Sequence, residues 1–167
     1  ATTACCAGAA AAQDGPDVDY TDVDDVAYIR SLIEEAAQTY SIDPTSVGLI
    51  GHSNGGFMAL RMACEVSELV TAVVSIAGST FEDASSCTPA TYPVSILTIH
   101  GTEDATIPYE GATFFEETYP GALETIDRFA TLAGCGSSSE LDNIDVDESI
   151  DGAETAVLSY TDCTPDT

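Results

Sequence analysis

Five consecutive residues, Gly51-His52-Ser53-Asn54-Gly55, have the types and the spacing for nucleophilic chemistry. They match the pattern G-x-S-x-G, in which a strained turn between a strand and a helix exposes a serine hydroxyl. The two glycines let neighbouring backbone pass close to the turn, and the N–H of Asn54 would face a developing oxyanion. Because the pattern is short, it indicates a nucleophile only if a strand precedes it and a helix follows. A glycine-rich turn without catalysis is the alternative.

A carboxylate that could assist such a serine lies in His100-Gly-Thr-Glu-Asp104, directly after an apolar run. Catalytic groups gather at the carboxyl ends of parallel strands, where both the serine and this aspartate would lie. Asp104 precedes a tight Ala-Thr-Ile-Pro loop that could hold a short carboxylate in place to orient an imidazole. Glu103 and Glu110 are the other acids nearby, and a solvated turn aspartate is the alternative for Asp104.

The chain contains two histidines, and neither is suited to be the catalytic base. His52 adjoins Ser53, and neighbouring side chains at a strand end point to opposite faces. His100 ends a strand and is expected to form a hydrogen bond within its own loop rather than to reach the serine. In the fold that carries this elbow the chain order is serine, acid, histidine, yet no histidine follows Asp104. The sequence therefore predicts a nucleophile and an acid without their base.

The elements expected around these residues alternate between helices and short apolar strands. Thr21 and Asp24 resemble a capping box at the start of a helix over 22–39, whose apolar residues recur at steps of three and four. The other expected elements are strands at 47–50, 69–77 and 94–100, helices at 54–65, 110–119 and 122–133, and a weak strand at 153–160, with a loop over 79–93 and a polar segment over 136–152. This order predicts one α/β domain, with a mainly parallel sheet and helices on both faces.

The charge of the chain excludes several classes of partner. Lysine is absent, three arginines stand against 29 acids, and the formal net charge is −26. Such a surface repels nucleic acid and anionic membranes, and no apolar run is long enough for a membrane span. An acidic partner surface or calcium sites could explain the acids, but their spread along the chain favours adaptation to high salt. The acidic segment 142–152 lacks the glycine and glutamate positions of a calcium loop, so we predict no metal site.

Six cysteines, at positions 5, 6, 64, 87, 135 and 163, indicate where the protein works. No pair has C-x-x-C spacing, and the two histidines are not placed to complete a zinc site. Disulfides in an oxidising compartment are the expected use, which predicts an extracellular protein. The chain begins with neither a methionine nor a signal peptide, so a signal peptide is expected upstream of residue 1.

Three stretches together resemble the secreted esterase family of polyhydroxybutyrate depolymerases, which includes feruloyl and acetylxylan esterases and LpqC-like lipoproteins. They are VDDVAYIRSLI at 23–33, GHSNGGFMALRMAC at 51–64 and IHGTEDATIPY at 99–109, in the order and spacing of the family. The resemblance implies a partial α/β-hydrolase fold. It implies Ser53 as the nucleophile and Asp104 as the acid.

The same resemblance implies how the cysteines pair and how much of the domain is present. Cys64 would pair with Cys87 and Cys135 with Cys163. A bond between the adjacent Cys5 and Cys6 would be strained, so one or both are expected to pair with a residue upstream of residue 1. Residues 1–167 would form a single incomplete α/β-hydrolase domain. It would lack the N-terminal strands, with their half of the oxyanion hole, and the C-terminal strand that carries the catalytic histidine.

The function implied is a secreted serine carboxylic-ester hydrolase, truncated and inactive as given. Its substrate would be a polyester or a plant cell-wall ester, cleaved by acyl transfer to water without a metal or organic cofactor. An acyltransferase or a serine peptidase is the alternative within enzymes, because the elbow and the acid do not encode the leaving group. A non-catalytic hydrolase-like binding module is the alternative outside enzymes.

Overall fold

The computed structural model describes residues 23–87, 93–114 and 117–163. In chain order its elements are α2 (Asp25–Thr39), β1 (Val47–His52), α3 (Asn54–Glu65), β2 (Val70–Ile76), the 3₁₀ turn η1 (Ala84–Ser86), β3 (Ser95–Ile99), β4 (Gly111–Phe114), β5 (Glu117–Pro120), α4 (Ala122–Leu132), β6 (Ser138–Ile144) and β7 (Thr155–Tyr160). The predictions of β1, β2, β3, β7, α2, α3 and α4 are thus confirmed, with bounds that differ by a few residues.

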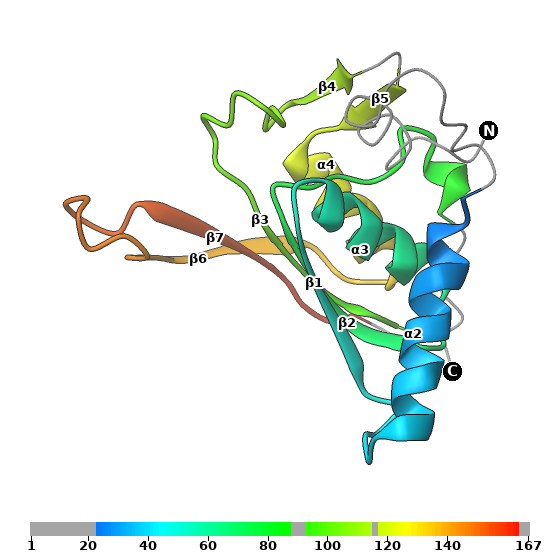
Figure 1. Cartoon of the computed structure of the whole chain (residues 1–167). Helices are drawn as coiled ribbons and strands as arrows, with labels where there is room; N and C mark the ends of the chain where they lie inside the picture. The colour runs from blue at the N-terminus through cyan, green and yellow to red at the C-terminus, as the bar shows by residue number, and fades with distance from the viewer. Residues whose placement is uncertain (1–22, 88–92, 115–116, 164–167) are drawn as a thin grey trace.

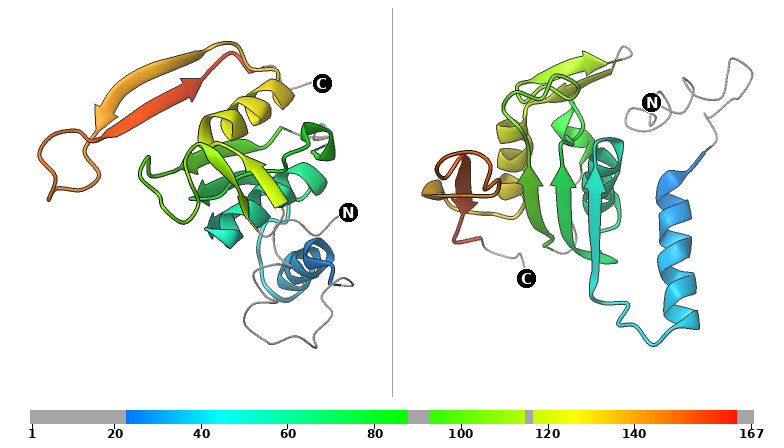
Figure 2. Two further views of the ribbon diagram at one scale, coloured as in Figure 1. Left: turned by 90° about the horizontal axis from the view of Figure 1, so that it is seen from above. Right: turned by 60° about the vertical axis from the view of Figure 1, so that its left-hand side comes forward.

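The three apolar strands form a parallel sheet in the order β1–β2–β3. Ile50 of β1 pairs with Val74 of β2, which pairs in turn with Leu97 of β3. Parallel strands need crossover connections, and α3 provides the one between β1 and β2. Figures 1 and 2 show that the three strands consequently run side by side and end at the same edge.

One face of the sheet carries the hydrophobic core. Leu60 and Met62 of α3 are fully buried against it, as are Val70 and Val73 of β2. Phe129 of α4 belongs to the same cluster, so both helices pack on this face. Burying a side chain of this size stabilises the fold by about 1.5–3 kcal/mol, which makes α3 the main support of the sheet.

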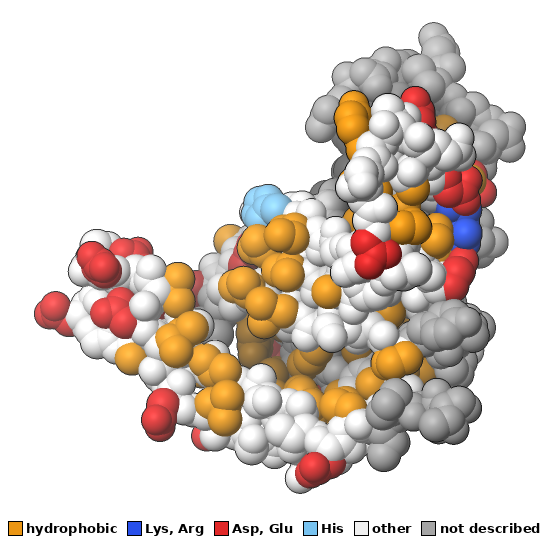
Figure 3. Space-filling view, turned by 90° about the horizontal axis from the view of Figure 1, so that it is seen from below, with side chains coloured by type: hydrophobic (Ala, Val, Ile, Leu, Met, Phe, Trp, Pro, Cys, Tyr) orange, Lys and Arg blue, Asp and Glu red, His pale blue; other side chains and the backbone are white. Residues whose placement is uncertain are grey.

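The opposite face of the sheet is open in the part of the chain that the structure describes. Ile50, Leu97 and Ile99 expose 77%, 53% and 47% of their surface there. Figure 3 shows hydrophobic side chains gathered between the body of the molecule and the β6–β7 hairpin. The predicted α/β class, a parallel sheet flanked by helices, is confirmed. Helices were expected on both faces of the sheet. In the described residues, the two helices that contact the sheet, α3 and α4, lie on the same face.

Helix α2 begins three residues later than predicted. Asp24 is itself the N-cap, because its carboxylate accepts a hydrogen bond of 2.9 Å from the N–H of Ala27. Thr21, the expected cap, lies outside the described residues. Val26 is buried and Ile29 packs beside it against the core cluster. The first half of the apolar stripe therefore faces the core, whereas Tyr40 at its end is exposed.

Residues 111–114 and 117–120 form the antiparallel strands of the β4–β5 hairpin, so the helix predicted over 110–119 is wrong. Gly111 has a φ of +84°, a left-handed conformation that interrupts a helix and suits glycine. Thr113 and Thr118 pair across the hairpin through their hydroxyls, 3.0 Å apart, as β-branched residues often do in strands. The hairpin carries Tyr119, which is buried.

The second hairpin, β6–β7, extends away from the sheet (Figure 1). The weak strand predicted over 153–160 is confirmed as β7, whereas β6 lies in the segment expected to be a polar loop. Every residue of β6 is exposed, so the strand has no buried face that a hydrophobic pattern could have indicated.

Both implied disulfides are present. Cys64–Cys87 links α3 to the loop after β2, and Cys135–Cys163 closes the base of the β6–β7 hairpin. Cys5 and Cys6 lie outside the described residues. Across a separation of 23 residues the first bridge stabilises the fold by about 3 kcal/mol in the chain-entropy account.

Two surface properties bear on what this chain can bind. Within 23–87, 93–114 and 117–163, no helix has the length and apolar character needed to cross a membrane. Over the same residues, no three histidine, cysteine or acidic side chains cluster as a set of metal ligands.

Candidate active site

The serine of the G-x-S-x-G pattern occupies a strained turn between β1 and α3. Ser53 has φ 54° and ψ −121°, a conformation that non-glycine residues rarely adopt. Its N–H donates to the carbonyl of Ile76 at 2.8 Å, and its own carbonyl accepts from Gly56 at 2.8 Å. The N–H of Ala77 donates to the carbonyl of Ile99, so hydrogen bonds continue across the ends of all three strands. These bonds hold Ser53 in a conformation that costs about 1–3 kcal/mol.

The glycines around the serine have different functions. A Cβ on Gly51 would lie 1.9 Å from the carbonyl oxygen of Gly55, so only glycine fits at position 51. Gly55 itself has no atom within 4 Å of such a Cβ, which differs from the close approach predicted for it. The second close approach belongs to Gly56, whose Cβ would lie 3.1 Å from the Cα of Gly78. Gly56 and Gly78 thus bring the start of α3 against the end of β2.

The position of the serine suits the stabilisation of an oxyanion. Ser53 is the N-cap of α3, and Asn54 is the first helical residue. The first N–H groups of a helix have no partner within the helix, and the helix dipole favours negative charge there. The N–H of Asn54, at the start of the predicted helix α3, is therefore available to a negatively charged oxygen.

The predicted acid lies in a turn that its own carboxylate organises. Oδ1 of Asp104 accepts hydrogen bonds from the N–H of Thr106, at 2.8 Å, and of Ile107, at 3.0 Å. These two bonds, with the nearby charges of His100 and His52, lower the pKa of Asp104. The carboxylate is therefore ionised at neutral pH, and its second oxygen has no close hydrogen bond in the described structure.

Neither histidine is hydrogen-bonded to Ser53 in the described part of the chain. The side chain of His100 exposes 5% of its surface, and its Nε2 lies 2.7 Å from the carbonyl oxygen of Ile107. The same nitrogen is 3.9 Å from Oδ2 of Asp104. His100 thus supports the acid turn, as expected of a local hydrogen bond. His52 is exposed.

A cavity of about 100 Å³ opens beside Ser53. Its lining comes from α3, from the loops after β2 and β3, and from the β4–β5 hairpin: Ser53, Asn54, Phe57, Arg61, Ser79, Thr80, Phe81, Ile107, Glu117, Thr118 and Tyr119. The rings of Phe57 and Tyr119 meet edge to face, with centroids 5.2 Å apart. Burial and the charge of Asp104 raise the pKa of Tyr119, so its phenol stays protonated at neutral pH.

Sequence reasoning identified Ser53 and Asn54 in this lining and missed the rest. The β4–β5 contribution was hidden by the wrong helix prediction over 110–119. The position of Ser79, Thr80 and Phe81 could have been predicted from the sequence. They follow a predicted strand, at the carboxyl edge of the sheet where ligands bind.

The fold resembles that of a solved esterase. The crystal structure of a thermostable esterase superimposes with a TM-score of 0.52 at 20% identity, over 65% of this chain and 26% of that one. At this identity the likeness concerns the fold alone.

Three curated relatives are feruloyl esterases by name. Feruloyl esterase B of Piromyces equi is 29% identical over 123 residues, 69% of this chain and 23% of the relative. A probable feruloyl esterase C of Aspergillus niger is 30% identical over 119 residues, 71% and 39% of the two chains. Feruloyl esterase C of Emericella nidulans is 29% identical over 124 residues, 73% and 45%. This chain therefore spans less than half the length of each of them.

A family match covers most of the chain. Residues 14–147, which include the elbow, the acid turn and the cavity, match the family described as Phospholipase/Carboxylesterase. The chain belongs to this phospholipase/carboxylesterase family.

Proposed function

We propose that Ser53 is the nucleophile and Asp104 the acid of a carboxylic-ester hydrolase. The observation that carries the proposal is the strained conformation of Ser53 at the N-terminus of α3, beside a cavity. Strain of this kind persists where the surrounding structure enforces it, and it is frequent at catalytic turns. The ionised Asp104 lies in the turn after β3, and β2 separates β3 from β1 in the same sheet.

The chemistry follows from these positions. The hydroxyl of Ser53 loses its proton to an imidazole and attacks the ester carbonyl, and the alcohol leaves with a proton. Water then releases the acid from the acyl-enzyme. The N–H of Asn54 stabilises the oxyanion in both steps, and the carboxylate of Asp104 orients the imidazole and stabilises its charged form.

The imidazole comes, in this proposal, from residues beyond those described. His100 is committed to the carbonyl of Ile107, and no histidine follows Asp104 in the chain. The greater length of the relatives supports further strands at the edges of this sheet, and the open face at Ile50, Leu97 and Ile99 has room for further elements that would cover it. Residues 1–167 would then be an incomplete α/β-hydrolase domain.

The substrate class is proposed from the relatives and the location from the disulfides. Feruloyl esters of plant cell walls come first because several relatives carry that name. Acetylated sugars and polyhydroxyalkanoates are alternative substrates within the same reaction. Two disulfides favour an oxidising location, so we propose a secreted enzyme.

The decisive experiment compares this chain with a longer natural protein that contains it. Hydrolysis of p-nitrophenyl acetate by the longer protein should fall at least about 10³-fold in Ser53→Ala and about 10²- to 10⁴-fold in Asp104→Asn. Ser46→Ala, an exposed serine before β1, is the matched control and should leave the rate unchanged.

Residues 1–167 alone should show little turnover. Strong turnover by this chain that disappears in His100→Gln would contradict the assignment of the base. A longer protein without ester hydrolysis, whose ligand binding survives Ser53→Ala, would instead identify a binding module.

A further inference from the structure

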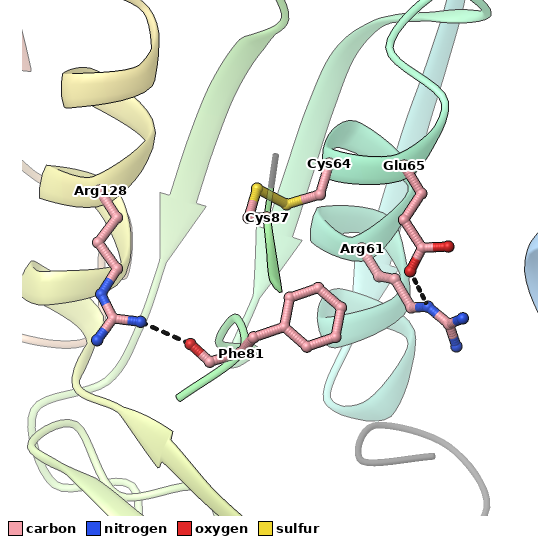
Figure 4. The surroundings of a disulfide bond; sticks show 6 residues. All are labelled: Arg61, Cys64, Glu65, Phe81, Cys87 and Arg128. Carbon is pink, nitrogen blue, oxygen red and sulfur yellow. Dashed lines mark hydrogen bonds and ion pairs between the residues drawn. A yellow bond between two sulfur atoms is a disulfide. The ribbon is translucent and has the colours of Figure 1, made fainter. Parts of the chain in front are cut away.

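Two loops at the carboxyl edge of the sheet line the cavity, and other elements anchor the first of them. Arg128 of α4 donates to the carbonyl of Phe81, in the loop after β2, at 2.6 Å. The Cys64–Cys87 disulfide ties the end of the same loop to α3. Figure 4 shows the arginine and the disulfide reaching this loop from two different helices. This wall of the cavity is therefore fixed from outside the loop.

The loop after β3, which carries the predicted acid, keeps its shape by internal contacts. Its Ile107 is buried and lines the same cavity. Among the described residues, every hydrogen bond of 101–107 has its partner within 100–107. The bond with the greatest separation in sequence joins His100, directly after β3, to Ile107. His100 is therefore the residue that closes this loop.

The hydrogen bond of His100 can have only one direction. Its Nε2 lies 2.7 Å from the carbonyl oxygen of Ile107, and because a carbonyl can only accept, Nε2 must carry the proton. The side chain exposes only 5% of its surface, and its ring meets that of Tyr109 edge to face, with centroids 5.8 Å apart. Packing and the hydrogen bond thus fix both the ring and its protonated nitrogen.

The backbone of Ile107 connects this hydrogen bond to the acid. Its carbonyl accepts from His100, while its N–H donates to Oδ1 of Asp104 at 3.0 Å. Pro108 follows and disfavours the helical conformation for Ile107, which limits how its N–H and its carbonyl can turn relative to each other. By holding the carbonyl, His100 therefore also holds the N–H against the carboxylate.

The two oxygens of the Asp104 carboxylate have different surroundings. Oδ1 accepts from the N–H groups of Ile107 and Thr106, and these two bonds are the main cause of the lowered pKa of Asp104. Oδ2 lies 3.9 Å from Nε2 of His100, beyond hydrogen-bonding distance. Because the proton on Nε2 is directed to Ile107, His100 leaves Oδ2 open to a different donor.

We propose that His100 is the positioning residue of the acid. Its hydrogen bond to Ile107 keeps one oxygen of Asp104 bound to the backbone, so that the other oxygen faces the N–H of the catalytic imidazole. The inference rests on the proposed role of Asp104. His100 acts through the carboxylate and takes no proton from Ser53.

NMR titration of residues 1–167, followed at the carboxyl carbon of Asp104, tests this contact without catalysis. His100→Leu removes the donor and the charge, so the pKa of Asp104 should rise toward its ordinary value, and the amides of Thr106 and Ile107 should exchange faster. His100→Gln also removes the charge but keeps an N–H near the position of Nε2. Both amides should then stay protected, and the pKa should rise less.

The other histidine provides the matched control. The charge of His52 also acts on Asp104, but His52 has no hydrogen bond to this loop in the described structure. His52→Leu should leave the amides of the loop protected. Equal effects of His52→Leu and His100→Leu would overturn the proposal, as would unchanged amides in His100→Leu. If His100→Leu does not fold, His100→Asn replaces it, because its shorter side chain brings no donor to the carbonyl of Ile107.

The longer natural protein provides the catalytic measurement. With p-nitrophenyl acetate, His100→Leu should lower kcat about 10- to 100-fold and leave KM nearly unchanged, because a displaced acid affects the transition state and not substrate binding. His100→Gln should retain most of the rate, and equal losses in the two variants would overturn the proposal. A rate lost in Asp104→Asn but kept in His100→Leu would overturn this proposal alone. A full rate in Asp104→Asn would instead overturn the assignment of the acid.

Discussion

The elbow and the β6–β7 hairpin hold their backbones in place by different means. At the elbow, Ser53 is strained but lies between a buried helix and the ends of three paired strands. In the hairpin, every residue of β6 is exposed. Cys135–Cys163 and a hydrogen bond from Tyr160 to Asp127 connect the hairpin to the body. Packing therefore determines the elbow, whereas one covalent bond and a few polar contacts hold the hairpin.

The largest effect is expected where the elbow leaves no space. Gly51→Ala would place a Cβ 1.9 Å from the carbonyl oxygen of Gly55, against backbone that cannot move without displacing Ser53. We expect the free energy of unfolding to fall by at least about 3 kcal/mol, or the chain not to fold. Urea unfolding followed by circular dichroism measures the loss.

The second glycine of the motif provides the control for this prediction. Gly55 lies in α3 with open space around its Cα, so Gly55→Ala should leave stability unchanged or raise it by up to about 1 kcal/mol. Equal losses in the two variants would show that the close approach at Gly51 does not limit the turn.

Removing each disulfide in turn should distinguish the contribution of core packing to stability from that of chain entropy. They close loops of similar length, 23 and 28 residues, so the entropy account predicts about 3 kcal/mol for each. Cys64 and Cys87 are buried in the core, and replacing both with alanine should lower the free energy of global unfolding by about 3–4 kcal/mol.

Replacing Cys135 and Cys163 should act locally. The hairpin can open while the sheet stays folded, so global unfolding should change by less than about 1 kcal/mol while the amides of β6 and β7 exchange faster. Hydrogen exchange measured in both double variants distinguishes the two effects. A global loss of equal size in the hairpin variant would refute the contrast drawn between the two regions.

The elbow was predictable because its signals are local. Adjacent residues alone indicate each of its three parts: the strand at 47–50, the glycine pattern at 51–55 and the helix from Asn54. All three agree with the fold. Gly55 was the exception: the pattern assigned it a close approach that belongs to Gly56. Such a distance depends on Gly78, which lies on another strand end and is invisible to a five-residue motif.

The hairpins and the cavity were less predictable because they depend on distant contacts. Residues 110–119 looked helical in the sequence, but the structure has a left-handed Gly111 and pairs Thr113 with Thr118 across β4 and β5. In β6 no apolar face exists to reveal a strand. The lining of the cavity combines Phe57, Ile107 and Tyr119, which come from three different parts of the chain, so no local pattern could have indicated it.

A smaller effect should reveal the strain at the elbow. Ser53→Gly places at this position the residue that adopts a φ of 54° without a steric penalty, so stability should rise by about 1–2 kcal/mol. Ser53→Ala keeps the strain and should not gain stability, which makes it the control. Both variants lack the hydroxyl, and thermal unfolding compares them. If Ser53→Ala gained as much stability as Ser53→Gly, the destabilisation would come from the serine hydroxyl and not from the backbone conformation.

The smallest effect concerns the polar attachment of the hairpin. Burial, together with the hydrogen bond and the charge of Asp127, raises the pKa of Tyr160 to about 12. Because the folded pKa exceeds the unfolded value of about 10, the stabilisation is fully present below pH 10. It is lost as the pH rises toward 12, when the phenol must ionise beside a carboxylate.

Tyr160→Phe should remove this attachment at every pH. We expect a loss of about 0.5–1 kcal/mol in the opening of the hairpin near pH 8, because the bond is partly exposed, and no further loss between pH 10 and 12. Hydrogen exchange of β7 near pH 8, and ultraviolet absorbance of the phenolate in brief exposures to higher pH, follow the two parts of the prediction. Tyr40→Phe, on an exposed ring at the end of α2, should leave the hairpin unchanged. If Tyr160 titrated near pH 10 in the folded protein, its bond to Asp127 would contribute nothing, and the disulfide alone would hold the hairpin.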